Sequence, residues 1–298
     1  MADKKVYGLM ILTTLFWSGA FIAGKLAMIE FTAPTLTCVR FLIALPFIFC
    51  VLKVMDKDAW WPTKQQWLPI LFVGTIGTFA YHILFFLSVK YTSAGNAALI
   101  GATMPGVTML LTVIGLKERT NARQLLGIAL AFVGVITVIT NGNLAMLQQL
   151  QLNFGDAMMF CAVLSISLYT IFNRLFMMKY TISPYKMTAF TFLVCTVEAS
   201  PWAVRDALNG TLQAVTLGGW LSVTYMAVFA SVMGYLFQLI AVREIGPTRS
   251  AVFNNLIPVF TLTLAALILG EPVSLYKAVA VVIIISGIYL ATQTKVKG

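Results

Sequence analysis

The chain has 298 residues, of which 60% are hydrophobic and only 10% are charged. Soluble domains carry about 25% charged residues, so this composition excludes an ordinary soluble globular protein. The net charge of +10 does not indicate a nucleic-acid partner, because lysine and arginine lie in short segments between apolar runs and not in one basic patch. Apolar runs long enough to cross a bilayer recur along the chain. We therefore expect an integral, multi-pass membrane protein whose partner is the lipid bilayer.

The apolar runs predict where the chain crosses the membrane. We expect ten transmembrane helices, at residues 7–28, 33–54, 67–89, 94–116, 122–140, 155–178, 184–203, 217–242, 247–270 and 274–293. Pro34, Pro184 and Pro247 open three of them, which suits proline because the first turn needs no N–H from it. The first run is longer than the apolar region of a signal peptide and has no small-residue cleavage site. We interpret it as a retained helix.

The distribution of basic residues predicts the orientation. Of the 20 lysines and arginines, Arg40 lies within a span, and those expected toward the outside are Lys25, Lys90, Arg205 and Lys277. The others fall at the N-terminus, at the C-terminus or in loops on the same side as the termini. Because cytoplasmic loops carry the excess of positive charge, we expect both termini in the cytoplasm. We expect the membrane to be the bacterial inner (plasma) membrane.

The two halves of the sequence resemble each other. At a constant offset of 153 residues, the aligned pairs are Lys90 with Arg243, Ala98 with Ala251, Pro105 with Pro258, Glu118 with Glu271 and Gly134 with Gly287. Trp17-Ser18 similarly parallels Ile166-Ser167. A repeat with an odd number of spans re-enters the membrane from the opposite face, so the halves are inverted and a substrate site is expected between them. We predict an all-α membrane protein of ten transmembrane helices in two inverted five-helix repeats, residues 1–140 and 155–298, joined by a loop at 141–154.

Several motifs give the chain a resemblance to a known family. They are Trp17-Ser-Gly-Ala-Phe21 with Lys25, Arg40-Phe41, Tyr81, the run Lys90–Ile100, Pro105, the Lys117-Glu118-Arg119 corner and the Gly127/Gly134 pair, repeated in the second half at Pro247, Ala251, Pro258, Glu271 and Gly287. In these features the chain resembles the drug/metabolite transporter superfamily, specifically its EamA-type ten-span branch. The resemblance implies a secondary transporter, which we expect to export small organic metabolites, above all amino acids or related compounds. The alternative substrates are amphipathic cationic drugs. One departure is Ile166, where the second half lacks the tryptophan of the first.

Polar and aromatic side chains deep within the spans are the candidates for substrate binding, because such groups usually face the interior of a helix bundle. The candidates are Trp17, Phe21, Arg40, Tyr81, His82, Tyr169, Asn173, Tyr235, Gln238, Asn254 and Asn255. At the repeat offset, His82 falls opposite Tyr235. The alternative for each residue is helix packing, or hydrogen bonding between helices.

Arg40 has two candidate partners, since a buried guanidinium needs a carboxylate or several carbonyls. It binds either a substrate carboxylate or Glu198, which lies near the same outer end of its span. Glu198 is also the candidate for proton coupling, with facilitated diffusion and antiport as alternatives. Pro105 and Pro258 each remove a backbone hydrogen bond inside a span, and their symmetric placement predicts hinges.

Other function classes lack the residues that they require. The sequence contains one histidine, and no H-E-x-x-H or G-x-S-x-G motif, so we expect no enzyme, no catalytic residue, no cofactor and no metal site. A channel would need a continuous polar path, whereas the polar residues here are scattered. Both a monomer and a homodimer are compatible with the sequence.

Overall fold

The computed structural model describes residues 2–57, 60–115, 121–140, 142–143, 153–246, 250 and 253–292. Over these ranges the chain is helical and contains no strand, which confirms the all-α prediction. Eight described helices are long and apolar enough to cross a membrane, and two shorter apolar helices lie at Leu256–Leu269 and Leu275–Leu290. The chain is therefore a multi-pass helical membrane protein.

The helices follow the order of the predicted spans. Those of the first half are α1 (Ala2–Ala27), α2 (Ala33–Asp56), α3, η2 and α4 (Lys64–Val73, Gly74–Ala80, Tyr81–Tyr91), α5 and α6 (Ala94–Gly101, Met104–Gly115), and α7 (Ala122–Ile139). Those of the second half are α9 (Phe154–Tyr180), α10 (Pro184–Leu208), α11, η4 and α12 (Leu217–Tyr225, Met226–Met233, Gly234–Ile245), α14 (Leu256–Leu269), and α15 (Leu275–Thr292). A short 3₁₀ helix, η3 (Thr211–Ala214), links α10 to α11.

The helix starts follow from local sequence. Thr32 precedes α2 and its side chain accepts a hydrogen bond from the backbone of Thr35, while Ser183 caps α10 in the same way. Such caps satisfy backbone N–H groups that have no partner within the helix. Pro34 and Pro184 lie in the first turns of these two helices, as predicted. Pro247 lies outside the described residues.

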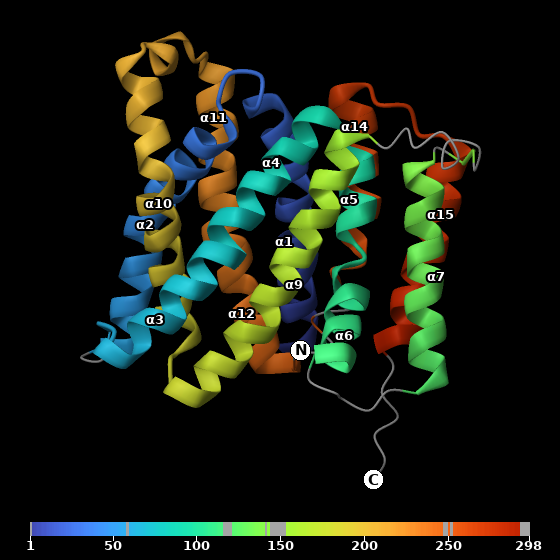
Figure 1. Ribbon diagram of the computed structural model, residues 1–298, viewed down its shortest axis with the longest axis horizontal. Coiled ribbons are helices and arrows are strands. Elements are labelled where there is room, and N and C mark those ends of the chain that lie inside the picture. The colour runs from blue at the N-terminus through green and yellow to red at the C-terminus, as the bar shows by residue number, and fades with distance from the viewer. Residues whose placement is uncertain are drawn as a thin grey trace.

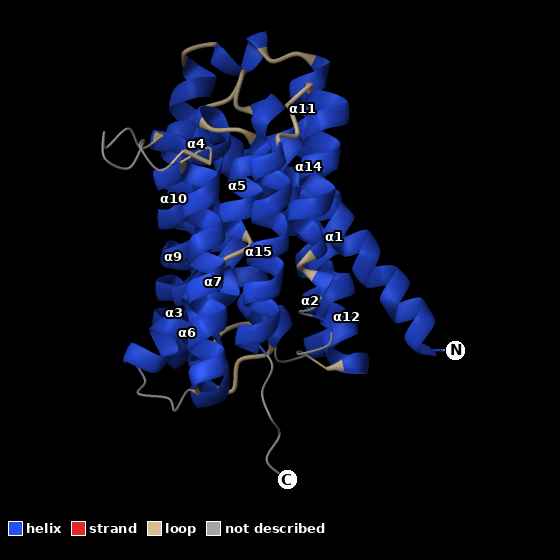
Figure 2. Cartoon of the chain, turned by 90° about the vertical axis from the view of Figure 1, so that its right-hand side faces the viewer, coloured by secondary structure: helices blue, strands red, loops and turns tan. Residues whose placement is uncertain are grey.

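The helices pack as a single bundle with paired flanks. Figure 1 shows α7 beside α15 on one flank and α2 beside α10 on the other, and these pairs are in close contact. Between them, α1 packs on α12 and α14, whereas α9 packs on α4, α5 and α6. The first turns of α1 project away from the bundle in Figure 2. Large apolar side chains such as Leu267 and Leu275 remain exposed on the outer surface, which suits contact with lipid.

Four spans depart from a continuous α-helix. The predicted spans 94–116 and 247–270 are interrupted, by a turn between Gly101 and Met104 and by a turn at Asn254–Asn255. Each turn lies a few residues before a proline, Pro105 or Pro258. The helix is interrupted there because proline has no backbone N–H to donate to the preceding turn. The predicted spans 67–89 and 217–242 contain the π-helical segments η2 and η4. Short π segments inside α-helices occur frequently at functional sites.

Candidate functional site

A buried arginine lies where the two halves of the chain meet. Arg40 on α2 is only 5% exposed, and its Nε donates a 2.9 Å hydrogen bond to Oγ of Ser231 on η4. The aromatic rings of Phe41 and Phe86 lie 5.5 and 5.9 Å from the guanidinium carbon. The charge is thus enclosed by apolar surface and held in position through one of its nitrogen atoms.

The rest of the guanidinium lacks a protein partner. Among the described residues, no carboxylate lies within 4.0 Å of Arg40, and neither Nη group has a hydrogen-bond partner. Glu198, its predicted alternative partner, instead accepts a hydrogen bond from Thr75 on η2. A buried charge is strongly disfavoured without a partner, and these Nη groups are donors that an anion can satisfy.

Aromatic and polar side chains surround this position. The ring of Tyr81 lies 4.8 Å from that of His82, and the ring of Tyr235 lies 5.7 Å from that of Phe192. Tyr169 and Tyr235 pack against the apolar cluster that contains Phe41. The His82 ring is packed edge-on, 4.7 Å from the ring of Phe41. Its Nδ1 lies 2.6 Å from the carbonyl oxygen of Thr78.

The two π segments place these side chains. η2 ends immediately before Tyr81, while η4 contains Ser231 and ends just before Gly234 and Tyr235. π geometry leaves a carbonyl free for another donor. In η4 this carbonyl belongs to Ala230, which accepts a 3.0 Å hydrogen bond from Trp17 Nε1 on α1.

In η2, the carbonyl of Ile76 accepts a hydrogen bond from Ser165 Oγ on α9 at 2.5 Å. Glycine permits both close approaches. A Cβ at Gly77 would lie 1.9 Å from Cδ2 of Tyr169, and one at Gly234 would lie 2.7 Å from Nε1 of Trp17. In each π segment, therefore, the first helix of the opposite half donates a side-chain hydrogen bond to a backbone carbonyl.

At the proline breaks too, the first helix of one half donates a hydrogen bond to a backbone carbonyl of the other half. The carbonyl of Ile257, directly before Pro258, accepts a 3.1 Å hydrogen bond from Ser18 Oγ on α1. The carbonyl of Met104, directly before Pro105, accepts a 3.4 Å hydrogen bond from Ser167 Oγ on α9. Buried carbonyls within a bilayer must find donors in the protein, and serine supplies them here.

The structure gathers only part of the predicted set around Arg40. Trp17 joins the cluster through its ring contact with Tyr235, at a centroid distance of 6.0 Å. Phe21 packs against Phe85, 4.9 Å between ring centroids, in the main apolar core. Among the described residues, no hydrogen bond or ring contact links Phe21 to Arg40.

The predicted amides lie apart from these contacts. Asn254 and Asn255 form the turn before α14, while Asn173 is on α9 and Gln238 is on α12. The buried Oδ1 atoms of Asn173 and Asn254 have no hydrogen-bond partner. They are therefore acceptors within the bundle that a solute or water can satisfy.

Three serines of the site were not predicted: Ser18, Ser167 and Ser231. Ser18 and Ser167 occupy matching positions, next to Trp17 and Ile166, and this match was the available signal. No group of three or more metal-binding side chains occurs in the part of the chain that the structure describes.

Comparison with known proteins identifies the family. The EamA-like transporter family model matches residues 4–140 and again residues 153–293. The chain belongs to the EamA-like transporter family. Two matches in tandem on this EamA-like transporter cover both halves of the bundle.

Relatives of this EamA-like transporter align over nearly its whole length. The Bacillus subtilis protein named uncharacterized transporter YyaM is 28% identical, covering 98% of this chain and 95% of the relative. Proteins named probable amino-acid metabolite efflux pump are 26% identical in Salmonella typhimurium and 27% identical in Escherichia coli. Each of these two alignments covers 95% of this chain and 93% of the relative. A solved crystal structure, 18% identical, superposes over 97% of this chain and 96% of its own with a TM-score of 0.61, so the fold is a known one.

Proposed function

We propose that this EamA-like transporter is a secondary transporter that exports amino acids or related carboxylated metabolites by alternating access. The observation that carries the proposal is Arg40, a buried residue whose Nη groups have no hydrogen-bond partner among the described residues. Arginine presents two parallel N–H donors that match the two oxygens of a carboxylate. A carboxylated solute would supply the negative charge that the described residues around Arg40 do not.

The surroundings of Arg40 favour the same substrate class. A fixed positive charge repels cations, which argues against the alternative of amphipathic cationic drugs. Tyr81, His82 and Tyr235 add hydroxyl and imidazole groups next to aromatic surface, which suits a small molecule with both polar and apolar parts. The names of the Salmonella and Escherichia relatives, amino-acid metabolite efflux pumps, agree with this choice.

In many secondary transporters, alternating access is based on two halves that are inverted copies. The paired bonds support such halves: Ser18 of the first half bonds to the carbonyl before Pro258, and Ser167 of the second half bonds to the carbonyl before Pro105. Lys25, near the end of α1, and Asp156, near the start of α9, line one pocket. The first helices of the two halves therefore run in opposite directions, as inversion requires.

These observations support repeats at residues 1–140 and 155–298, with the loop 141–154 between them. The proposal includes ten spans, which rest on the apolar runs, and cytoplasmic termini, which rest on the placement of basic residues. It also includes the bacterial inner membrane as the location. In this proposal Pro105 and Pro258 act as hinges, because both follow helix breaks.

Glu198 is the proposed group for proton coupling. Its Oε1 accepts from Thr75, whereas its buried Oε2 has no hydrogen-bond partner. Thr75 belongs to η2, the π segment that leads to Tyr81. A change in the charge of Glu198 would thus act on the helix that carries part of the Arg40 site.

Uptake into liposomes tests the proposed function. Purified protein would be reconstituted and offered a panel of labelled amino acids, with and without an imposed pH gradient. We expect saturable uptake that Arg40→Ala reduces at least tenfold, and that Arg205→Ala, an exposed arginine on α10, leaves unchanged. A gradient response that disappears in Glu198→Gln would support proton coupling. If amphipathic cations are transported equally well by Arg40→Ala and no amino acid is transported, the proposal is wrong.

A further inference from the structure

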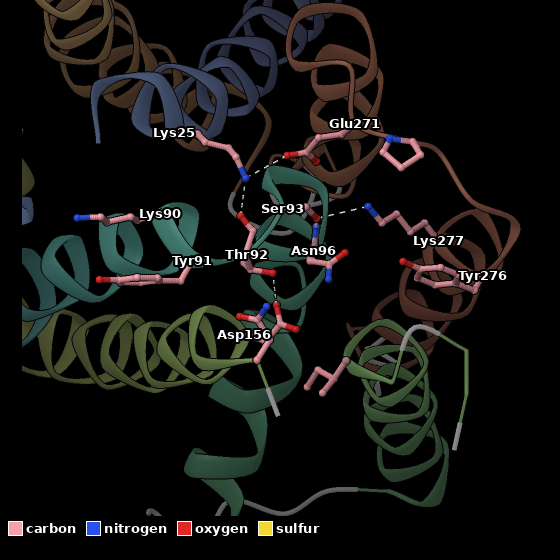
Figure 3. Close-up of a pocket in the computed structure, with 13 residues that line it drawn as sticks. Lys25, Lys90, Tyr91, Thr92, Ser93, Asn96, Asp156, Glu271, Tyr276 and Lys277 are labelled. Atoms are coloured by element: carbon pink, nitrogen blue, oxygen red, sulfur yellow. Dashed lines mark hydrogen bonds and ion pairs between the residues drawn. The ribbon is translucent and has the colours of Figure 1, made fainter. Parts of the chain in front are cut away.

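A polar cavity lies at one end of the bundle, apart from Arg40. It has a volume of about 580 Å³ and lies where α1 and α4 end and where α5, α9 and α15 begin. Figure 3 shows its lining, which includes Lys25, Lys90, Asn96, Asp156, Glu271 and Lys277. None of the candidate residues around Arg40 belongs to this lining. The positions of Lys25, Lys90 and Lys277 assign this end of the bundle to the outer face in the proposed orientation.

Two of the charged residues neutralise each other and form one wall of the cavity. Glu271 accepts hydrogen bonds from the backbone N–H groups of Ala94, at 2.8 Å, and Gly95, at 3.2 Å. It also forms a 3.3 Å ion pair with Nζ of Lys25, which in turn donates to the carbonyl of Thr92 at 2.6 Å. This pair is satisfied by the protein and has a structural role.

The charges of Asp156 and Lys277 are opposite but not paired with each other. Asp156 is 2% exposed, and its Oδ1 accepts a 2.6 Å hydrogen bond from the Thr92 hydroxyl. Lys277 is 4% exposed, and its Nζ donates one long hydrogen bond, 3.3 Å, to the Ser93 hydroxyl. Among the described residues, no ion pair within 4.0 Å joins Asp156 or Lys277 to any group. Buried charges are costly unless they are paired, so both gain from a ligand of opposite charge.

Asn96 supplies an independent observation at the same place. It is 7% exposed, lines the cavity, and its Oδ1 has no hydrogen-bond partner. Its side chain interacts with the carboxyl group of Asp156, and Figure 3 shows it between Asp156 and Lys277. An unsatisfied acceptor in this position favours a ligand that donates hydrogen bonds.

We propose that this cavity binds a small zwitterion, an α-amino acid, with its carboxylate at Lys277 and its ammonium group at Asp156 and Asn96. A simple anion would be repelled by Asp156, and a simple cation by Lys277, whereas a zwitterion satisfies both charges. The choice of an amino acid rests on the proposed function, while the charge arrangement does not. In an exporter this cavity is the position that the solute occupies after it leaves Arg40 and before it reaches the outer solution.

Protection from thiol modification tests the proposal. Lys90 lines the cavity and is exposed, so Lys90→Cys would be introduced after the four natural cysteines are replaced by serine. The protein, in liposomes, would react with a membrane-impermeant methanethiosulfonate reagent. We expect L-alanine to slow the reaction at least threefold, and equal concentrations of propionate or L-alaninamide, which each carry one of its two charges, to leave the rate unchanged.

The variants locate the protecting ligand. Lys277→Met and Asp156→Asn should each abolish protection; the second keeps the size of the side chain and tests the site even if the first fails to fold. Lys64→Met, an exposed lysine on α3, is the matched control and should retain protection. Arg40→Ala should also retain it, because the two sites are separate.

The proposal is overturned if L-alanine protects Lys277→Met and Asp156→Asn as well as it protects the parent protein, or if propionate alone protects equally. Absence of protection together with saturable, Arg40-dependent uptake would overturn this site and leave the proposed function standing. Protection without any amino-acid uptake would show that the site exists and that the proposed function is wrong.

Discussion

Replacement of Glu271 by alanine should destabilise the protein measurably. The carboxylate accepts bonds from two N–H groups at the start of α5 and forms an ion pair with Lys25. Loss of a side chain that caps a helix N-terminus costs about 1 kcal/mol, within a range of about 0.5–2. The ion pair adds about 0–1 kcal/mol, because the Lys25 side chain is 30% exposed and solvent screens it. We therefore expect a loss of about 1.5 kcal/mol.

Thermal unfolding of the purified protein in detergent measures this loss. At about 2–4 °C per kcal/mol, Glu271→Ala should lower Tm by about 3–6 °C. Glu271→Gln keeps an acceptor for the N–H groups but removes the charge, so its Tm should lie between those of the alanine variant and the parent protein. Glu244→Ala is the control. The Glu244 side chain is 49% exposed, and its 3.6 Å ion pair with Arg243 is expected to contribute little to stability. If Glu271→Ala and Glu244→Ala lower Tm equally, the capping role of Glu271 is wrong.

Two further substitutions test the contacts of the π segments. Gly77→Ala would place a Cβ 1.9 Å from the ring of Tyr169, so overpacking should cost about 1–3 kcal/mol and lower Tm, whereas Gly8→Ala, with no atom within 4 Å, should not. Equal melting of these two variants would contradict the close approach. Trp17→Phe removes the hydrogen bond to the carbonyl of Ala230, which costs about 1 kcal/mol or more because the acceptor is buried. We expect amino-acid uptake into liposomes to fall about fivefold, and unchanged uptake would show that η4 does not depend on this bond.

The sequence predicts the helical architecture because membrane spans have a strong physical signature. A run of about 20 apolar residues has few stable conformations in lipid other than a helix. The interior prolines Pro105 and Pro258 likewise predict the interrupted spans, since a proline ring cannot continue the hydrogen-bond ladder. These features depend on neighbouring residues only, which is why they are visible in one sequence.

The π segments and their bonding partners depend on tertiary contacts, which local sequence does not reveal. η4 is bonded through the carbonyl of Ala230 to Trp17, more than 200 residues earlier in the chain. The sequence around Ser231 does not distinguish it from other small residues of apolar helices, and its contact with Arg40 is visible only in the structure. Of the two partners considered for Arg40, Glu198 does not pair with it, for the same reason. Placement near one end of two spans does not decide which side chains face each other.

The measurement that tests the role of Arg40 most directly is discrimination between an amino acid and its carboxamide. The two differ in one charge, so the ratio of their inhibition constants in the uptake assay reports the interaction with the carboxylate. We expect the parent protein to bind the carboxylate form at least 30-fold more tightly, which corresponds to about 2 kcal/mol for a buried, hydrogen-bonded charge pair. In Arg40→Ala the ratio should fall close to one. A ratio that stays unchanged in Arg40→Ala would show that the carboxylate is bound elsewhere.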